Sequence, residues 1–280
     1  MELKYTAIRS GRLSAILRED MELSLGLMNK LKWQDKLLVN GTPRHTDFAV
    51  NPGDIITVTL DEPTPDYPAE DGALTVLYED EHILAVDKPA GMLIHPSRSR
   101  LTGTLANYVL GYYQKTGQQS AFHPLTRLDR DTFGVVLLAK NSHIHALLSA
   151  KGFQKEYWAL VKGGPEADSG TIDAPIARLP LPSLLRHVHP DGKPSVTEYT
   201  VLKRMGDSCL LSLIPVTGRT HQLRVHCAYM GFPILGDPQY GTPDDYPHQQ
   251  LLAHKVTLTH PITGKTLEIT SKLKVLPQKP

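Results

Sequence analysis

The chain has 280 residues, of which 40% are apolar, and it carries 30 Lys and Arg against 29 Asp and Glu, a net charge of +1. This length fits one large domain, or a domain of about 200 residues beside a small one, and the composition is that of a globular rather than a disordered protein. The near-zero charge excludes a chain that is polybasic as a whole. Two cysteines exclude a disulfide scaffold and indicate a reducing compartment.

The apolar runs and the N-terminus bear on where the protein works. The longest uninterrupted apolar run, Val135 to Ala139, falls far below the roughly 20 residues that cross a bilayer. The first residues, MELKYTAIRSGRLSAIL, carry polar or charged side chains every few positions and lack the apolar core of a signal peptide. We therefore expect a cytoplasmic protein without a membrane partner.

Residues 1–60 are predicted to form a small unit of helices and a hairpin. Apolar residues recur at roughly helical spacing between residues 13 and 31. Asn40-Gly41 follows a strand-like run and predicts a tight turn, because both residue types tolerate positive φ. The β-branched run 55–60 is predicted to be a strand of the same unit.

Residues 61–73 are rich in proline and acidic residues, and this composition predicts a linker between that unit and a larger domain over 74–275. In the larger domain, strand-like runs often follow one another without a helix between them. We therefore expect an α+β domain with a mixed, mainly antiparallel sheet. Strands are predicted at 74–78, 82–88, 134–140, 157–163, 196–203, 209–216 and 255–260, and helices at 104–113, 141–151 and 220–230.

Charge is distributed unevenly along the chain. Residues 1–62 hold 8 Lys and Arg and 9 Asp and Glu, whereas residues 88–155 hold 9 basic residues and 2 acidic ones, Asp129 and Asp131. The local excess of positive charge fits either a solvated surface or an anion-binding cleft, and charge alone does not choose between them.

Motifs for metals and cofactors are missing from the sequence. GKT at 264–266 resembles part of a phosphate-binding loop, but the glycine required five residues earlier is Thr259, so we expect a hairpin tip. His221 and His226 are five residues apart and would lie on different faces of a helix. Because HExxH and paired CxxC patterns do not occur either, we expect neither a metal nor a cofactor.

Two segments carry candidate chemistry. RLDRDTFG (127–134) places two carboxylates among two arginines, and an arginine beside a carboxylate favours the ionised form that a nucleophile or base needs. The same pattern fits a structural turn closed by Asp–Arg hydrogen bonds. If 218–226 is helical, Arg219 and Arg224 point about 140° apart. One would then face a phosphate and the other an internal carboxylate, unless both lie on the surface.

Four ordered segments resemble the motifs of the RluA-type family of RNA pseudouridine synthases, which modify ribosomal and transfer RNA. They are DKPAGMLIHP (87–96), RLDRDTFG (127–134), KEYWALVKG (155–163), and TGRTHQLRVH (217–226) followed by GFPILGD. The first 60 residues resemble the alpha-L RNA-binding module that is often joined to these enzymes. The resemblance implies the pseudouridine synthase fold, an isomerase without cofactor or metal, a structured RNA as partner, and a monomer.

The resemblance also implies roles for single residues. Asp129 matches the essential aspartate, which acts at the anomeric centre of the sugar or on an adjacent ribose proton. Tyr157 matches the tyrosine that stacks on the base, and Arg224 matches the arginine that pairs with the aspartate. The residues that would contact RNA are Arg127, Arg130, Thr132, Lys155, Arg219 and His221.

The chain departs from the family pattern at two positions, and two alternative functions stay open. Thr126 stands where the family has His, and Phe133 stands where it has Ser. These departures fit a catalytically impaired RNA-binding protein of the same fold. A glycoside hydrolase needs two carboxylates roughly 5–10 Å apart, which Asp129 and Asp131 would supply. The expected function is that of an RNA pseudouridine synthase.

Overall fold

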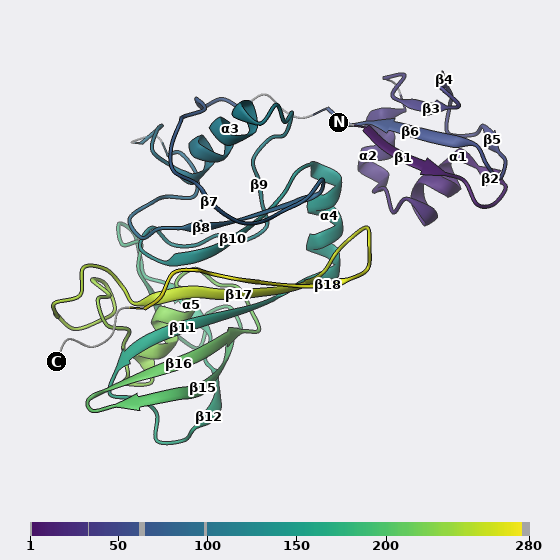
Figure 1. Cartoon of the computed structure of the whole chain (residues 1–280). Coiled ribbons are helices and arrows are strands. Elements are labelled where there is room, and N and C mark those ends of the chain that lie inside the picture. The colour runs from purple at the N-terminus through teal and green to yellow at the C-terminus, as the bar shows by residue number, and fades with distance from the viewer. Residues whose placement is uncertain (1, 33, 62–64, 98–99, 276–280) are drawn as a thin grey trace.

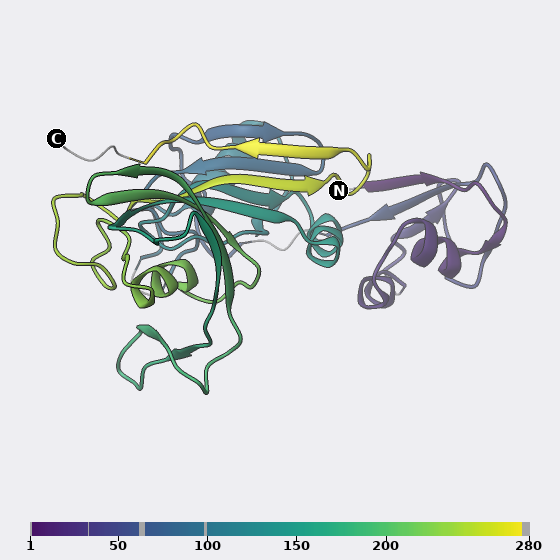
Figure 2. The ribbon, with the colours of Figure 1, turned by 90° about the horizontal axis from the view of Figure 1, so that it is seen from below.

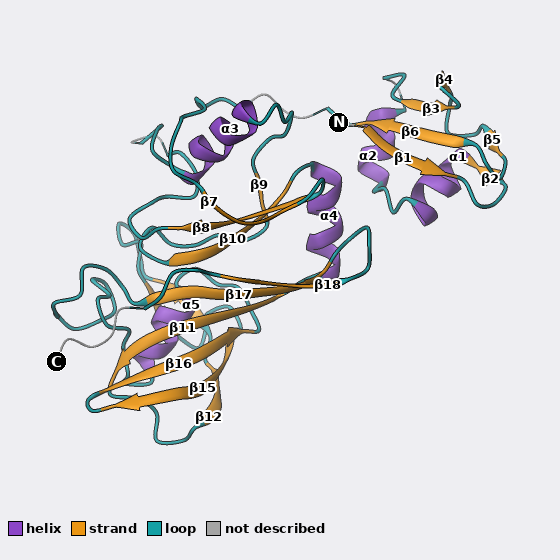
Figure 3. Ribbon diagram, in the orientation of Figure 1, coloured by secondary structure: helices purple, strands orange, loops and turns teal. Residues whose placement is uncertain are grey.

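The structure, a computed structural model, describes residues 2–32, 34–61, 65–97 and 100–275. Within these ranges the chain forms an N-terminal unit and a larger unit built on a ten-stranded sheet (Figures 1 and 3). The large sheet is mixed and mainly antiparallel, and helices cover both of its faces, which confirms the expected α+β class.

The N-terminal unit is a four-stranded antiparallel sheet with short helical segments against it. Asn40 and Gly41 form its tight turn with φ angles of 51° and 78°, as predicted. Its buried apolar residues form a cluster of their own, drawn from Ala7 to Leu60. In chain order the elements are β1 (Glu2–Thr6), β2 (Gly11–Arg12), α1 (Leu13–Ala15), the π-helical turn η1 (Ile16–Asp20), α2 (Leu25–Leu31), β3 (Leu37–Val39), β4 (Thr42–Pro43), β5 (Ala49–Val50) and β6 (Ile55–Thr59).

The segment expected to be a linker is in part packed against the larger unit. Residues 62–64 lie outside the described ranges, but the part from 65 onward contacts helix α3 (Leu105–Lys115). Asn107 Nδ2 donates to the carbonyl of Pro68 at 2.7 Å, and the backbone N–H of Glu70 donates to Asn107 at 3.0 Å. These bonds hold the segment on the helix, so it does not extend freely into solvent.

The large sheet has the strand order β12-β15-β16-β11-β17-β10-β8-β7, with β18 beside β17 and β9 beside β10. Strands β10 and β17 are parallel where they meet, and the other described pairs are antiparallel. The strands are β7 (Thr75–Glu79), β8 (Ile83–Lys88), β9 (His123–Pro124), β10 (Phe133–Ala139), β11 (Gln154–Lys162), β12 (Ser169–Asp173), β15 (Val196–Met205), β16 (Ser208–Pro215), β17 (Leu251–Thr259) and β18 (Thr266–Thr270).

Every strand predicted for the larger domain is present, with ends that shift by a few residues. GKT at 264–266 lies at the turn between β17 and β18, which confirms the predicted hairpin tip. The sequence did not predict β9, β12, β18 or the short hairpin of β13 (Ile176–Arg178) and β14 (Arg186–Val188), because these strands are short and carry few apolar residues. The hairpin projects from the sheet face that carries helix α5 (Gln222–Tyr229), as Figure 2 shows.

Helices α3 and α5 cover one face of the sheet, and α4 (Ser142–Lys151) covers the other. Successive residues of β8 alternate between the two sides: Leu84 packs in the cluster under α3, and Ile83 packs in the cluster under α4. Tyr157 of β11 contacts both the cluster under α3 and the cluster under α5. It therefore lies where these two clusters meet.

The register of the central strands depends on a glycine. Gly134 of β10 pairs with Ala253 of β17, which in turn pairs with Tyr157 of β11. Gly134 has a φ of 109°, and a Cβ atom there would lie 2.3 Å from the carbonyl oxygen of Ala253. Because other residues would clash and be strained, glycine is required for this approach. The approach brings the segment that precedes β10 close to Tyr157.

The length and composition of the helices show whether any of them is able to span a membrane. Within the described ranges, the helices are too short or too polar to cross a membrane.

Candidate active site

A cavity of about 250 Å³ opens between the β9–β10 connection, β11 and the N-terminal end of α5. It brings together residues that are far apart in the sequence. Every predicted site residue except Arg130 lines it: Arg127, Asp129, Thr132, Lys155, Tyr157, Arg219, His221 and Arg224.

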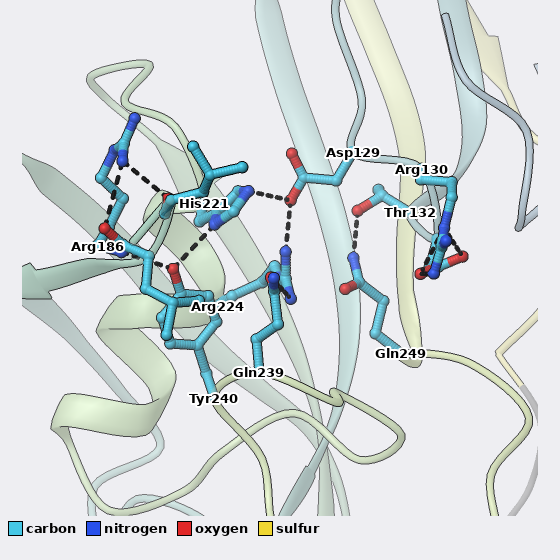
Figure 4. A network of polar contacts seen from close by, with 12 residues as sticks. Asp129, Arg130, Thr132, Arg186, His221, Arg224, Gln239, Tyr240 and Gln249 are labelled. Atoms are coloured by element: carbon cyan, nitrogen blue, oxygen red, sulfur yellow. Dashed lines mark hydrogen bonds and ion pairs between the residues drawn. The ribbon is translucent and has the colours of Figure 1, made fainter. Parts of the chain in front are cut away.

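Arg224 of α5 is the centre of a network of ion pairs in this cavity (Figure 4). Its Nη1 donates to Asp129 Oδ2 at 3.0 Å. Its Nε and Nη2 donate to the two carboxylate oxygens of Asp237 at 2.7 Å each, and Nη2 also donates to Gln239 Oε1 at 2.9 Å. The Arg224 side chain is 5% exposed and that of Asp237 is 0% exposed, so their bidentate pair is removed from water.

The burial of this pair is compensated by its contacts. Burial alone would lower the pKa of Arg224, but the hydrogen bonds and charges of Asp237 and Asp129 raise it above its ordinary value. For Asp237, burial opposes ionisation, yet the Arg224 guanidinium and two backbone N–H groups lower its pKa. Both groups are therefore charged at neutral pH, as a buried pair must be to remain stable.

Asp129 lies on the connection between β9 and β10 and is partly open to the cavity. Its side chain is 29% exposed, and Oδ1 accepts no hydrogen bond from any residue in the described ranges. The arginine that pairs with it is Arg224 and not a sequence neighbour. Arg130 instead donates to the adjacent Asp131 at 2.8 Å, and its side chain is 59% exposed. Neither Arg130 nor Asp131 lines the cavity, so the second carboxylate of a glycoside hydrolase is missing from it.

His221 stands immediately before α5 in an unusual backbone conformation. Its φ is 57°, in the left-handed region that a residue with a side chain adopts at a cost of about 1 kcal/mol or more. Its Nδ1 lies 2.8 Å from the Tyr240 hydroxyl, and its Nε2 lies 3.8 Å from Asp129 Oδ2 (Figure 4). Burial, more than any other influence, lowers the pKa of His221, so the ring is neutral at pH 7. Arg219 precedes the helix, which begins at Gln222, and is exposed at the cavity rim.

Tyr157 and Lys155 reach the cavity from β11. Burial, and secondly the negative charge of Asp129, raise the pKa of the Tyr157 hydroxyl, which therefore keeps its proton. Burial lowers the pKa of Lys155, whose ammonium group lies 5.6 Å from the ring centre of Phe153. The cavity thus combines a carboxylate with a free oxygen, a protonated phenol and several cations.

The two departures from the family pattern have structural partners. Thr126 Oγ1 accepts the backbone N–H of Leu137 at 2.9 Å. The Phe133 ring is buried edge-to-face against His248, with ring centres 5.1 Å apart. These contacts tie both ends of the segment that carries Asp129 to the rest of the fold.

A second cavity, of about 490 Å³, adjoins the first and shares Gly218 and Arg219 with it. Its lining includes one acidic residue, Asp191, and four basic residues: Arg178, Arg186, Lys193 and Arg219. Each of the three arginines donates to a backbone carbonyl, and none of them forms an ion pair with a described carboxylate. These bonds hold the three guanidinium groups in place beside the first cavity, without a direct ion pair to a described carboxylate.

The basic run 88–155, by contrast, does not form a continuous basic surface. Lys88 is completely buried, where its ammonium group donates to three backbone carbonyls, and burial lowers its pKa to about 8. Four other basic residues of the run are neutralised by carboxylates: Lys115 by Asp71, Lys140 by Glu79, Lys151 by Glu22 and Arg130 by Asp131. Of this run, Arg127 and Lys155 reach the first cavity.

Sequence reasoning missed the residues that support the site from the segment after α5. Asp237 ends the GFPILGD segment, so a signal for it was present. Gln239, Tyr240 and Gln249 lie in irregular structure and offered no periodic pattern. Gln249 nevertheless holds Thr132 through a hydrogen bond of 2.5 Å. The structure also shows no group of three or more His, Cys, Asp or Glu side chains arranged to hold a metal ion in the described ranges.

Comparisons with known proteins point to one family. The sequence profile of the family described as RNA pseudouridylate synthase matches residues 82–229. An uncharacterized RNA pseudouridine synthase of Bacillus subtilis, YlyB, is 39% identical over 248 residues, which cover 85% of this chain and 82% of that protein. Ribosomal large subunit pseudouridine synthase D of Pseudomonas aeruginosa is 34% identical over 258 residues, 85% of this chain and 80% of that protein.

A solved structure agrees with these relatives. Human RNA pseudouridylate synthase domain containing 1 superposes with a TM-score of 0.60 at 26% identity, over 73% of this chain and 86% of that one.

The buried ion pair generates a prediction about stability. Arg224→Met should lower the free energy of unfolding by about 3–5 kcal/mol, because it leaves the Asp237 carboxylate buried without its cation. Arg219→Met, at an exposed arginine five positions earlier, should change it by less than about 0.5 kcal/mol. Urea denaturation followed by circular dichroism measures both. Equal stability of the two variants would contradict a structural role for the pair.

Proposed function

Because this chain belongs to the RNA pseudouridylate synthase family, we propose that Asp129 is the essential residue with which it isomerises uridine to pseudouridine in RNA. The reaction detaches uracil from the ribose, turns it, and rejoins it through carbon. It needs no group donor and no change of oxidation state. The observation that supports this role is the Asp129–Arg224 pair, 3.0 Å long, in a cavity beside Tyr157.

The two oxygens of Asp129 have different surroundings, and this difference assigns their roles. Oδ2 is bonded to Arg224, whereas Oδ1 has no donor within the described ranges, and the residue lines the cavity. Oδ1 is therefore the oxygen that attacks the anomeric carbon or removes the adjacent ribose proton. Both routes need the carboxylate to be held in a fixed position, which the Arg224 guanidinium provides at 3.0 Å.

Tyr157 contributes its ring and its hydroxyl in different ways. The ring lines the cavity next to Asp129, where it stacks on the detached base. The hydroxyl keeps its proton at neutral pH, since burial raises its pKa, so it is able to donate that proton to the base or to a hydrogen bond.

RNA contacts surround the carboxylate on two sides. Arg127, Thr132 and Lys155 line the cavity and hold the everted nucleotide, and the second cavity receives the adjoining phosphates through Arg219 and the β13–β14 hairpin. Removing a base from its stack costs a few kcal/mol, which contacts between these cations and phosphates offset.

The substrate we propose is a structured ribosomal or transfer RNA, bound by a cytoplasmic monomer. Ribosomal RNA is favoured because the relative from Pseudomonas aeruginosa is named for the large ribosomal subunit. Residues 1–60 act as an alpha-L-like RNA-binding module ahead of the catalytic domain at 74–275. The assignment is tested by mapping pseudouridine in ribosomal and transfer RNA from cells that lack this protein. If no pseudouridine site is lost from either class of RNA, the assignment is overturned.

Asp129→Asn should abolish isomerisation and leave RNA affinity nearly unchanged, because the substitution keeps the shape of the side chain and removes its charge. We expect a single-turnover rate below about 3% of that of the unmodified protein, a loss typical of an essential nucleophile or base. Asp131→Asn is the matched control, since this carboxylate pairs with Arg130 outside the cavity. The assignment fails if Asp129→Asn stays active or if both variants lose activity equally.

Tyr157→Phe should keep RNA affinity and slow turnover, because the ring stays and the proton-carrying hydroxyl is lost. We expect the rate to fall about 100-fold, within the usual range for one proton-transfer group. Tyr157→Leu should in addition weaken binding, because it removes the ring on which the base stacks. Normal turnover by the first variant together with normal binding by the second would disprove both roles.

RNA affinity should depend steeply on salt, and the basic residues that line the second cavity should account for much of the dependence. Replacing Arg178, Lys193 and Arg219 by Gln should reduce the slope of log affinity against log salt by about 2 to 3, at roughly 0.7–0.9 for each lost phosphate contact. The matched control replaces three exposed cations of the N-terminal unit by Gln: Arg12, Arg18 and Lys30. If the control loses the slope instead, the N-terminal unit is the electrostatic anchor.

A further inference from the structure

The hydroxyl of Tyr240 sits between a backbone donor and a histidine ring. Its oxygen accepts the backbone N–H of Arg186 at 2.9 Å and lies 2.8 Å from His221 Nδ1 (Figure 4). Burial raises the pKa of Tyr240, so the phenol carries its proton. A backbone N–H is always a donor, and no other described acceptor bonds to this phenol. The phenol proton is therefore directed at His221 Nδ1.

This hydrogen bond decides where the histidine proton lies. A neutral imidazole has one N–H and one bare nitrogen, and the nitrogen that accepts from a phenol must be the bare one. Nδ1 is thus unprotonated and Nε2 carries the proton. Nε2 is the atom that faces Asp129, at 3.8 Å from Oδ2.

We propose that Tyr240 is a positioning residue that fixes the tautomer of His221, so that His221 presents a neutral Nε2–H donor to the catalytic carboxylate of Asp129. The separation of 3.8 Å is longer than a hydrogen bond. Hydrogen bonds in active sites are often long before substrate binds and shorten in the complex. Together with Arg224, the donor confines Oδ2 and leaves Oδ1 as the reacting oxygen. This inference rests on the role proposed for Asp129.

The charges around His221 explain why a neutral donor suits this position. The groups that act on the ring are the carboxylates of Asp129 and Asp237, the guanidinium groups of Arg224 and Arg186, and the Tyr240 phenol. Arg224 already supplies a full positive charge to Asp129 Oδ2 at 3.0 Å. A second cation at His221 would weaken the carboxylate as a nucleophile or base, whereas a neutral N–H orients it without that penalty.

The direct test is the tautomer of His221, read by nitrogen-15 NMR of the RNA-free protein. Unmodified protein should show the proton on Nε2. Tyr240→Phe keeps the ring, which lies 4.9 Å from the Arg224 guanidinium, and removes the hydroxyl. That variant should show a mixture of tautomers and a higher pKa of His221, because a hydrogen bond to the neutral form is lost. This readout involves no RNA, so it is independent of the proposed function.

The same variant has a kinetic signature. The single-turnover rate of Tyr240→Phe should fall about tenfold with RNA affinity unchanged, and the acidic limb of its pH profile should move to higher pH. In a His221→Gln background, where an amide supplies an N–H donor that has no tautomer, Tyr240→Phe should cause no further loss of rate.

Three results would overturn the proposal. The first is a proton on His221 Nδ1 in the unmodified protein. This measurement does not depend on whether any variant folds. The second is an unchanged tautomer in Tyr240→Phe. The third is a full additional loss of rate when Tyr240→Phe is combined with His221→Gln, which indicates a purely structural phenol.

Discussion

A single buried guanidinium, that of Arg224, organises the site. It bonds to Asp129 from the β9–β10 connection and to Asp237 and Gln239 from the segment after its own helix. A charge removed from water must be paired and hydrogen-bonded. The position of Arg224 therefore fixes the positions of both segments that bond to it. The bidentate bond to Asp237 fixes the plane of the guanidinium, and its remaining edge then fixes Asp129.

Backbone geometry supplies the second constraint. Gly134 lets β10 approach β17 so closely that a Cβ atom would lie 2.3 Å from the Ala253 carbonyl oxygen. Through Ala253, the register aligns the start of β10 with Tyr157 on β11. The carboxylate that precedes β10 and the phenol on β11 therefore share one cavity, even though they come from strands that are not direct neighbours. Arg224 sets the orientation of Asp129, and Gly134 sets its distance from Tyr157.

The pattern of charge in space differs from the pattern along the chain. Most basic residues between positions 88 and 155 bond to other groups of the protein. For example, the Lys88 ammonium group donates to backbone carbonyls, and Lys140 forms an ion pair with Glu79. The arginines of the β13–β14 hairpin and Arg219 line the second cavity and form no ion pair with a described carboxylate. Side chains that lie within hydrogen-bonding distance neutralise one another regardless of their separation in sequence, so a count of charges along a segment does not locate a binding surface.

The sequence by itself determined the longer strands and the helices of the larger domain, the class of sheet, the Asn40-Gly41 turn and the identity of the family, because these depend on local periodicity, local backbone preference and ordered motifs. It also singled out Asp129, Tyr157 and Arg224 as candidates for the site. The family motifs implied that Arg224 pairs with Asp129, whereas the residues alone also allowed a local Asp–Arg turn. Only the tertiary structure shows the contact, which joins residues 95 positions apart while Arg130 turns to Asp131. It likewise brought Tyr240 to His221, because contacts between distant segments are set by packing and by the pairing of buried charges, which no local pattern records.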